Sequence, residues 1–309
     1  MSGFEVISSG IFTLLQDKGR FGLTHLGVTN SGVMDEYAAL MAQKLLHNES
    51  NTNILEIAFS NVVLKATQDT TLCVTGAKCE FFINDQSRQS WQTYDINQGD
   101  TVKIGKITQG QRVYLAVKDG FDIPKEFGSN ATTVKEKIGG ISGQQIKSND
   151  FLPYKKQNQK FSNLYHQRLQ PIHVPKYDEE VLTLRVLLSY QEESFSALEK
   201  EKFFNSVYTV TSDFNRMACK LSGEEIKSDL DGIISEGISF GSIQIPKDGQ
   251  PIVLLKERQT IGGYPKIGSV INIDCFKLAQ RKIGTKICFE PIDIQTAQEK
   301  LKDFYLTFK

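Results

Sequence analysis

The segment that decides the fold and the site is Glu257-Arg-Gln-Thr-Ile-Gly-Gly-Tyr-Pro-Lys-Ile-Gly268. It follows the apolar run Pro251-Ile-Val-Leu-Leu255, which predicts a buried strand. Gly262 and Gly263 permit a positive φ and a close approach of the backbone to a ligand. Exposed Arg, Gln, Thr, Tyr and Lys side chains on a loop held by a strand are typical of a polar binding site. A solvated surface hairpin would have the same composition.

The charge balance and the hydropathy argue against several classes of protein. Lys+Arg and Asp+Glu both number 36, so the net charge is zero and the pI is near 6.9. A nucleic-acid-binding protein normally carries a basic excess. No apolar run approaches the roughly 20 residues that span a bilayer, and Met1-Ser-Gly-Phe-Glu-Val6 lacks the regions of a signal peptide. We therefore expect a cytoplasmic chain that binds neither nucleic acid nor membrane.

The cysteines and histidines do not predict a metal site. The five cysteines are scattered, with no CxxC pair, and there are only four histidines. A structural zinc site needs four closely spaced ligands of these types. We expect no bound metal.

Short strands separated by turn residues predict a mainly β chain with a few helices. In the first half, strands are expected at 71–74, 80–83, 100–104 and 112–117, with Gly76 and Gly110 marking turns. A second β-rich stretch begins near residue 183, after a linker-like segment at 155–180 that contains Pro171 and Pro175. This organisation predicts two units, residues 1–165 and 166–309. The expected helices cover residues 36–46, 194–205, 274–281 and 293–303.

The two halves contain a weak internal repeat. Leu14-Leu-Gln-Asp-Lys18 parallels Leu254-Leu-Lys-Glu-Arg258, and in each copy a glycine-rich loop leads to a helix expected to start at an Asp. The recurrence of these features in one order favours duplication over chance. We therefore expect the loops at 16–32 and 259–268 to meet across a shared cleft.

Polar loop residues are the candidates for chemistry. The first loop carries Asp17, Arg20 and His25, although the first two could instead form an ion pair that ties the loop to its strand. Arg216 could bind a carboxylate or carbonyl group through both guanidinium nitrogens. Glu236 and Gln244 precede the signature segment and could be either site residues or buried hydrogen-bonding groups.

Within the signature segment, three side chains could stabilise an oxyanion or a carboxylated intermediate: Arg258, Gln259 and Lys266. His25 or Glu236 would carry the proton, since His titrates near neutrality. We assign catalysis to His25, Glu236, Arg258 and Lys266. The predicted substrate-binding residues are Asp17, Arg20, Arg216, Gln244, Gln259, Thr260, Gly262, Gly263 and Tyr264.

Familiar catalytic motifs do not occur in the sequence. There is no GxxxxGK[ST] phosphate loop, and Gly139-Gly-Ile-Ser-Gly143 lacks the necessary lysine. There is also no GxSxG elbow and no cysteine in a recognisable nucleophile setting. A site made of binding groups without a nucleophile predicts that a partner completes it.

The signature Gln259-Thr-x-Gly-Gly-Tyr-Pro-Lys-Ile267 resembles that of the biotin-dependent carboxyltransferase-like family related to allophanate hydrolase subunit 2. Further blocks of the resemblance are Ser235-Glu-Gly-Ile238, Gly241-Ser-Ile-Gln-Ile-Pro246 and Asp248-Gly-Gln-Pro-Ile-Val-Leu254. Others lie near the start, in Gln16-Asp-x-Gly-Arg20, His25-Leu-Gly-Val28 and Gly32-Val-Met-Asp35. The likeness thus covers almost the whole chain. Where the family usually has Met-Gly-x-Arg-Leu, this chain has Met217-Ala-Cys-Lys-Leu221 and so lacks that glycine and arginine.

The resemblance implies two cyclophilin-like β-barrel units and a role within an enzyme complex. The leading expectation is a subunit of an ATP-dependent 5-oxoprolinase that opens 5-oxoproline to glutamate. Its partners would be an allophanate hydrolase subunit 1-like protein and a lactam-utilisation subunit, and ATP could bind with a partner's help. One alternative is the carboxyltransferase component of a urea-carboxylase-like system, which needs biotin on another protein. Another is a non-catalytic antagonist that binds a kinase inhibitor.

Overall fold

The computed structural model describes residues 1–155 and 167–308 and divides into two compact units. Unit 1 comprises Met1–Arg20 and Ser31–Asp178, and unit 2 comprises Phe21–Asn30 and Glu179–Lys309. The expected boundary between residues 165 and 166 lies outside the described residues, so that division of the chain stays a prediction.

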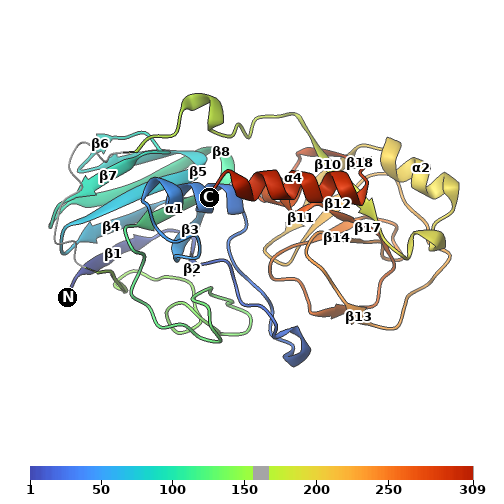
Figure 1. Cartoon of the computed structure of the whole chain (residues 1–309), viewed down its shortest axis with the longest axis horizontal. Helices are drawn as coiled ribbons and strands as arrows, with labels where there is room; N and C mark the ends of the chain where they lie inside the picture. The colour runs from blue at the N-terminus through green and yellow to red at the C-terminus, as the bar shows by residue number, and fades with distance from the viewer. Residues whose placement is uncertain (156–166, 309) are drawn as a thin grey trace. The chain divides into compact units, whose positions relative to one another are not determined.

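The described residues are mainly β, with four α-helices, and Figure 1 shows both units. The helices are α1 (Glu36–Leu45), α2 (Ala197–Asn205), α3 (Asn272–Leu278) and α4 (Ile294–Leu306), with 3-10 turns η1 (Thr24–Leu26), η3 (Pro171–His173) and η4 (Glu192–Ser194). The strands of unit 1 are β1 (Gly3–Ser9), β2 (Phe12–Gln16), β3 (Ile54–Ala58), β4 (Val62–Ala66), β5 (Thr70–Ile83), β6 (Gln86–Ser87), β7 (Thr93–Ile96), β8 (Thr101–Val117) and β9 (Phe151–Pro153). Those of unit 2 are β10 (Val181–Leu188), β11 (Tyr208–Phe214), β12 (Ala218–Ser222), β13 (Glu236–Gly237), β14 (Ser242–Gln244), β15 (Ile252–Leu254), β16 (Ile261–Gly262), β17 (Lys266–Val270) and β18 (Lys286–Pro291).

Unit 1 is a nine-stranded sheet built around two long strands. The sheet runs β2-β3-β8-β4-β1-β9, and β5 joins it by pairing with β8, β6 and β7. Strand β8 pairs with β4 near its start and with β3 near its end, which curls the sheet into a half-barrel. Apolar side chains of these strands fill one core, including Phe4, Leu55, Val74, Phe81 and Leu115.

The glycines expected to mark turns lie where the long strands bend. Gly76 and Gly110 do not end strands; they lie within β5 and β8 with φ of 87° and 83°. A Cβ at Gly76 would lie 2.4 Å from the Arg112 carbonyl oxygen, so the bend needs glycine for space as well as for φ. The four strands expected at 71–74, 80–83, 100–104 and 112–117 are therefore two continuous ones.

Unit 2 is a closed barrel in the order β10-β17-β14-β15-β12-β11-β18. The parallel pairing of β10 with β18 closes it, whereas the other neighbours are antiparallel. Beneath α2, the rings of Phe203 and Phe289 stack at 4.4 Å and Tyr208 lies beside both. Strands β13 and β16 form a separate two-stranded ribbon. The expectation of a mainly β chain with barrel-like units is confirmed.

Capping residues explain where the helices begin. Asp35, Ser196 and Asp293 accept hydrogen bonds from the first turns of α1, α2 and α4. Helix α3 begins differently from our expectation: it starts at Asn272 without a side-chain cap, and Asp274 lies inside it. The Asp274 carboxylate instead binds Arg185 of β10 through both oxygens, at 2.7 and 2.6 Å, and so fastens α3 to the barrel.

No helix among the described residues combines the length and the apolar character needed to cross a bilayer.

Candidate functional site

An ion pair between Glu236 and Lys266 is the centre of the candidate site in unit 2. Glu236 begins the ribbon strand β13 and Lys266 begins the barrel strand β17, and the Lys266 Nζ contacts Glu236 Oε1. The Lys266 side chain is only 8% exposed, whereas that of Glu236 is 33% exposed. The ammonium group is thus enclosed and the carboxylate is partly open to solvent. The expectation of an exposed Lys266 on a loop is therefore wrong.

Tyr190 and Gln191 complete the hydrogen-bonding around this pair. The Tyr190 hydroxyl donates to Glu236 Oε2, and Gln191 Nε2 donates to Glu236 Oε1 at 2.9 Å. Gln191 Oε1 accepts from the Lys266 backbone N–H at 2.9 Å, and the Lys266 ammonium lies 5.6 Å from the centre of the Tyr190 ring. We call Tyr190, Gln191, Glu236 and Lys266 the Glu–Lys cluster.

Tyr190 and Gln191 are not among the residues selected from the sequence, because no motif marks them. They follow β10, whose antiparallel pairing with β17 sets Leu188 opposite Gly268 and brings the next residues beside Lys266. The Ser189 N–H donates to the Ile267 carbonyl at 3.1 Å and continues that pairing. Only the strand register, which is not visible in the sequence, could have identified these residues.

Hydrogen bonds within the cluster shift the pKa values of Glu236 and Tyr190. Hydrogen bonds from Lys266 and then from Tyr190 hold the pKa of the Glu236 carboxyl below its usual value. The hydrogen bond to Glu236 raises the pKa of the Tyr190 hydroxyl. At neutral pH the cluster therefore presents a carboxylate and a phenol that keeps its proton. A Glu236 that stays ionised is better suited to orienting Lys266 than to donating a proton.

Gln244 and Gly262 lie next to the Glu–Lys cluster. Strand pairing sets Gln244 opposite Lys266 in the barrel and Gly262 opposite Glu236 in the ribbon. A Cβ at Gly262 would lie 2.7 Å from Gln244 Nε2 and 2.4 Å from Ile238 Cδ1. Neither Gly262 nor Gly263 has a positive φ, so the expectation of a left-handed backbone there is wrong. A side chain at position 262 would therefore require the ends of the Ile238 and Gln244 side chains to shift.

These groups place several hydrogen-bond donors and one carboxylate close together. The ammonium of Lys266, the hydroxyl of Tyr190 and the amide of Gln244 are donors, and the Glu236 carboxylate is the acceptor that holds two of them. A carboxylate or a polarised carbonyl of a ligand could take over those donors. This chemistry suits a small amide that carries a carboxylate.

Arg258 lies in a different environment, packed beneath the loop. Its Nε donates to the Ile238 carbonyl at 3.0 Å and its Nη1 to the Leu255 carbonyl at 3.4 Å. Its Nη2 donates to Asn30 Oδ1 at 3.1 Å, so the first loop contacts the residue just before the segment 259–268. The shared cleft between the two loops stays a prediction. Burial lowers the pKa of the Arg258 guanidinium. These contacts fit a role in holding the loops as well as one in binding.

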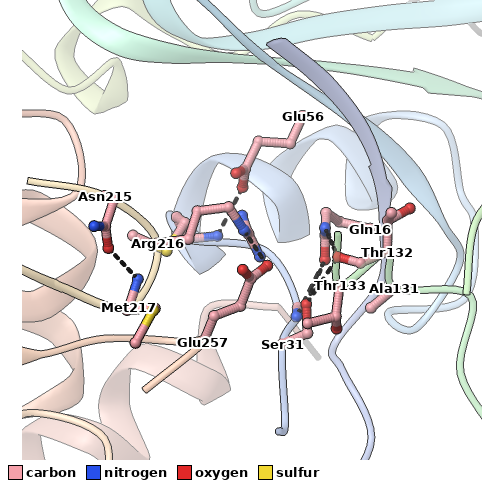
Figure 2. Close-up of polar contacts among 12 residues, drawn as sticks. Gln16, Ser31, Glu56, Ala131, Thr132, Thr133, Asn215, Arg216, Met217 and Glu257 are labelled. Carbon is pink, nitrogen blue, oxygen red and sulfur yellow. Dashed lines mark hydrogen bonds and ion pairs between the residues drawn. The ribbon is translucent and has the colours of Figure 1, made fainter. Parts of the chain in front are cut away.

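Arg216 is held by a neighbouring carboxylate. Its Nε donates to Glu257 Oε1 at 2.5 Å, and the Glu257 N–H donates to the Arg216 carbonyl at 2.8 Å (Figure 2). The same turn is shaped by Asn215, whose Oδ1 accepts from the Met217 N–H at 2.7 Å. Arg216 thus binds the carboxylate of Glu257 in the chain itself, and its predicted role in binding substrate stays a prediction.

The remaining candidates of unit 2 are more open to solvent. His25 lies exposed in η1, and Gln259 and Tyr264 are exposed on the signature loop. Thr260 and Gly263 are half-buried, and their carbonyls accept from the backbone of residues 238 and 233. The residues of the Glu–Lys cluster bond to one another rather than to His25. The role of His25 as a proton carrier stays a prediction.

Asp17 and Arg20 are buried in unit 1, where both hold the segment 129–133. Asp17 accepts from Ser129 Oγ at 2.6 Å and from the Asn130 N–H at 2.7 Å. Arg20 donates to the Ala131 carbonyl at 2.5 Å and to Thr133 Oγ1 at 3.0 Å. Gln16 and Ser31 donate to the Thr132 carbonyl of the same segment (Figure 2). These contacts give Asp17 and Arg20 a structural role, but toward this segment rather than as the ion pair considered above.

Among the described residues, no group of three or more His, Cys, Asp or Glu side chains is placed to hold a metal ion. All five cysteines are free thiols. Burial raises the pKa of Cys73 and Cys275 well above the usual range, so neither supplies a thiolate near neutral pH.

Comparison with known proteins places the chain in a family. The model of the carboxyltransferase domain, subdomain A and B, matches residues 26–291. The chain is 32% identical to the C subunit of 5-oxoprolinase from Haemophilus influenzae over 92% of this chain and 89% of that protein. It is 30% identical to the corresponding protein of Escherichia coli, which has the same name, over 97% and 94%. It is also 28% identical to urea amidolyase of Lachancea kluyveri over 96% of this chain, but this spans only 17% of that protein.

A solved structure shows the same fold. The urea amidolyase of K. lactis superposes with a TM-score of 0.88 and 24% sequence identity, covering 99% of this chain and 20% of that one.

Proposed function

The chain belongs to the family of carboxyltransferase domains, subdomain A and B, and we propose that it is the C subunit of an ATP-dependent 5-oxoprolinase. The complex would open the lactam of 5-oxoproline by hydrolysis, giving glutamate. The observation that carries this proposal is the pair of relatives named as 5-oxoprolinase C subunits, which this chain matches over nearly its whole length and theirs.

The Glu–Lys cluster supports the proposal chemically. 5-Oxoproline carries a carboxylate and a lactam carbonyl, and Lys266, Tyr190 and Gln244 offer donors for these oxygens. Opening the ring adds water across the C–N bond, so that the carbonyl carbon becomes a carboxylate and the nitrogen gains a proton. Lys266 would stabilise the negative charge that develops on the carbonyl oxygen during this addition. Glu236 would hold the Lys266 ammonium in place.

The proposal includes partner subunits. The described residues of the Glu–Lys cluster supply donors and a carboxylate, and the buried thiols of Cys73 and Cys275 keep their protons near neutral pH. We propose that the remaining catalytic groups come from partners. We propose that these resemble allophanate hydrolase subunit 1 and a lactam-utilisation protein. ATP would be consumed by the assembled cytoplasmic complex, whichever of its proteins binds it.

Reconstitution tests the proposed function. The chain would be purified together with the two proposed partner subunits, and glutamate release from 5-oxoproline would be measured with and without ATP. We expect release that requires ATP and disappears when this chain alone is omitted. Absence of release from a complex shown to be assembled, or full release without this chain, would overturn the proposal.

A second candidate function rests on the urea amidolyase relatives. In that case the chain would transfer a carboxyl group from biotin carried by another protein. Supplying a carboxylated biotin carrier and urea in place of ATP and 5-oxoproline distinguishes the two. Consumption of carboxybiotin that depends on urea would favour the transferase.

A further inference from the structure

A cleft in unit 1 collects cationic side chains without a carboxylate. Its volume is about 440 Å³, within the roughly 300–1,000 Å³ of small-molecule sites. Four basic residues line it: Lys78, Arg88, Arg168 and Lys176. No Asp or Glu is among its described lining residues, although the whole chain carries equal numbers of acids and bases. We call it the cationic cleft.

The contacts of these cations leave their charge uncompensated. Arg88 Nη2 donates to Gln86 Oε1 at 2.7 Å and Arg168 Nη2 to Gln89 Oε1 at 2.8 Å, and both acceptors are neutral amides. No ion pair within the described residues involves any of the four cations of the cleft. Two carboxylates interact with lining residues of the cleft: the buried carboxylate of Asp35 accepts from the Tyr177 hydroxyl at 3.2 Å, and the charge of Glu80 acts on Cys79.

The inner part of the cleft is apolar. Trp91 is 5% exposed and lines the cleft together with Leu169, Val174 and Pro175. The backbone of Trp91 has a φ of 65°, which is unusual for a residue other than glycine, and its N–H donates to the Val74 carbonyl at 2.6 Å. Strained residues of this kind persist where the surroundings over-determine them, often at ligand sites.

The outer wall of the cleft is fastened to the sheet. The Tyr37 hydroxyl donates to the His173 carbonyl at 2.8 Å, and the Leu169 N–H donates to the Trp91 carbonyl at 2.9 Å. The wall residues 168–177 are therefore held in place by contacts within unit 1. A preformed site loses less entropy on binding than one that must be ordered.

From these observations we propose that the cationic cleft binds an organic polyphosphate, with the phosphates on the four cations and an apolar or aromatic body against Trp91. A single carboxylate would neutralise only one of the four charges, whereas a di- or triphosphate would engage most of them. The guanidinium groups of Arg88 and Arg168 suit phosphate oxygens geometrically. Burial raises the pKa of Cys79, which also lines the cleft, to about 11. The site therefore binds its ligand without covalent attack by this thiol.

The single tryptophan of the chain makes this site directly measurable, because Trp91 is the only source of indole fluorescence. The isolated chain would be titrated with ADP, pyrophosphate and adenosine, with calorimetry to exclude optical artefacts. We expect saturable binding of ADP, weaker binding of pyrophosphate, and none of adenosine. The double variant Arg88→Ala/Arg168→Ala should weaken ADP binding at least about tenfold, the effect of losing one good charged contact.

A matched variant controls for the loss of positive charge. Lys125→Ala also removes exposed positive charge from unit 1, but Lys125 lines a different cavity, so ADP binding should be unchanged. Absence of ADP binding by both methods, or equal ADP binding by the double variant and the unmodified chain, would overturn the proposal. Equal binding of adenosine and ADP would also overturn it, because the cations would then contribute nothing. The measurement needs no partner protein, so its outcome is independent of the proposed 5-oxoprolinase activity.

Discussion

The Lys266 side chain is only 8% exposed, and its ammonium contacts the carboxylate of Glu236, which is partly open to solvent. Because the Lys266 side chain is enclosed and the Glu236 carboxylate is partly open to solvent, a ligand could reach the ammonium without a prior movement of Lys266. Preorganised charge of this kind stabilises developing negative charge more than the same groups would in water.

Replacing Lys266 by Met should raise the pKa of the Glu236 carboxyl toward its ordinary value of about 4.3. In the folded protein, the pKa of the Glu236 carboxyl is lowered chiefly by Lys266. The pair therefore stabilises the fold at a pH above the ordinary pKa of Glu236, and this stabilisation is lost as the pH falls through the lowered pKa. The Lys266→Met variant should not show this loss of stability at acidic pH. Carbon NMR of the labelled carboxyl measures the shift directly. An unchanged Glu236 pKa in the variant would contradict the assignment, and Lys202→Met, which breaks a Lys–Glu pair in α2, is the control.

Arg258→Ala should lower the free energy of unfolding by about 2 kcal/mol, since hydrogen bonds of a charged group contribute roughly 1.5–3 kcal/mol. The variant would leave the Ile238 carbonyl and Asn30 without their donor. Gln259→Ala is the control, because Gln259 is exposed and its replacement should change the free energy of unfolding by less than about 0.5 kcal/mol. Chemical denaturation measures both. Equal stabilities of the two variants would mean that Arg258 does not hold the loops.

At the residue level, the sequence predicts which residues belong to the candidate site but not how deeply they are buried. Glu236, Gln244, Gly262 and Lys266 were all selected from the sequence, and the structure brings them together. Their burial could not be read from the sequence, because a polar segment rich in glycine looks the same whether it faces solvent or packs under a ribbon. Tyr190 was missed because a side chain brought in by strand register leaves no local pattern.

Among the elements, the strand β14 depends on the glycine that precedes it. Gly241 has a φ of 87°, and a Cβ there would lie 2.3 Å from the Val270 carbonyl oxygen of β17. Gly241→Ala should therefore add steric repulsion of about 1–3 kcal/mol to the left-handed strain of about 1–2 kcal/mol. At Gly284, φ is 90° but no atom lies within 4 Å of the added Cβ, so Gly284→Ala should show the strain alone. Equal melting temperatures of the two variants would contradict this account of the barrel.

The sequence predicts whether a segment forms a strand or a helix, but it does not predict the lengths of β5 and β8. Alternation of apolar residues identified the strands, and Asp35 correctly marked the start of α1. The sequence predicts turns at Gly76 and Gly110 because a local pattern cannot distinguish a chain reversal from a bend inside a long strand. Pairing along most of the lengths of β5 and β8, between residues far apart in the chain, is what makes those strands continuous.

On the scale of the whole molecule, one segment of the N-terminal half of the sequence belongs to unit 2. Residues 21–30 belong to unit 2, where Asn30 contacts Arg258 of the signature segment. The internal repeat pointed to a contact between these two regions of the sequence. It did not predict how differently the two units are built, since one is an open, curled sheet and the other a closed barrel.

The most direct test of the proposed function is the rate of ATP-dependent glutamate release by the reconstituted complex carrying Lys266→Met. Removing one preorganised donor to a developing oxyanion typically costs about 10²–10³ in rate. We expect a loss of that size, with the complex still assembled on gel filtration, and a near-normal rate for Lys202→Met. Tyr190→Phe, which removes only a hydroxyl from an exposed residue, should also slow release if folding obscures the first variant. Assembled Lys266→Met and Tyr190→Phe complexes that release glutamate at the unmodified rate would contradict the assignment of the reaction to the Glu–Lys cluster.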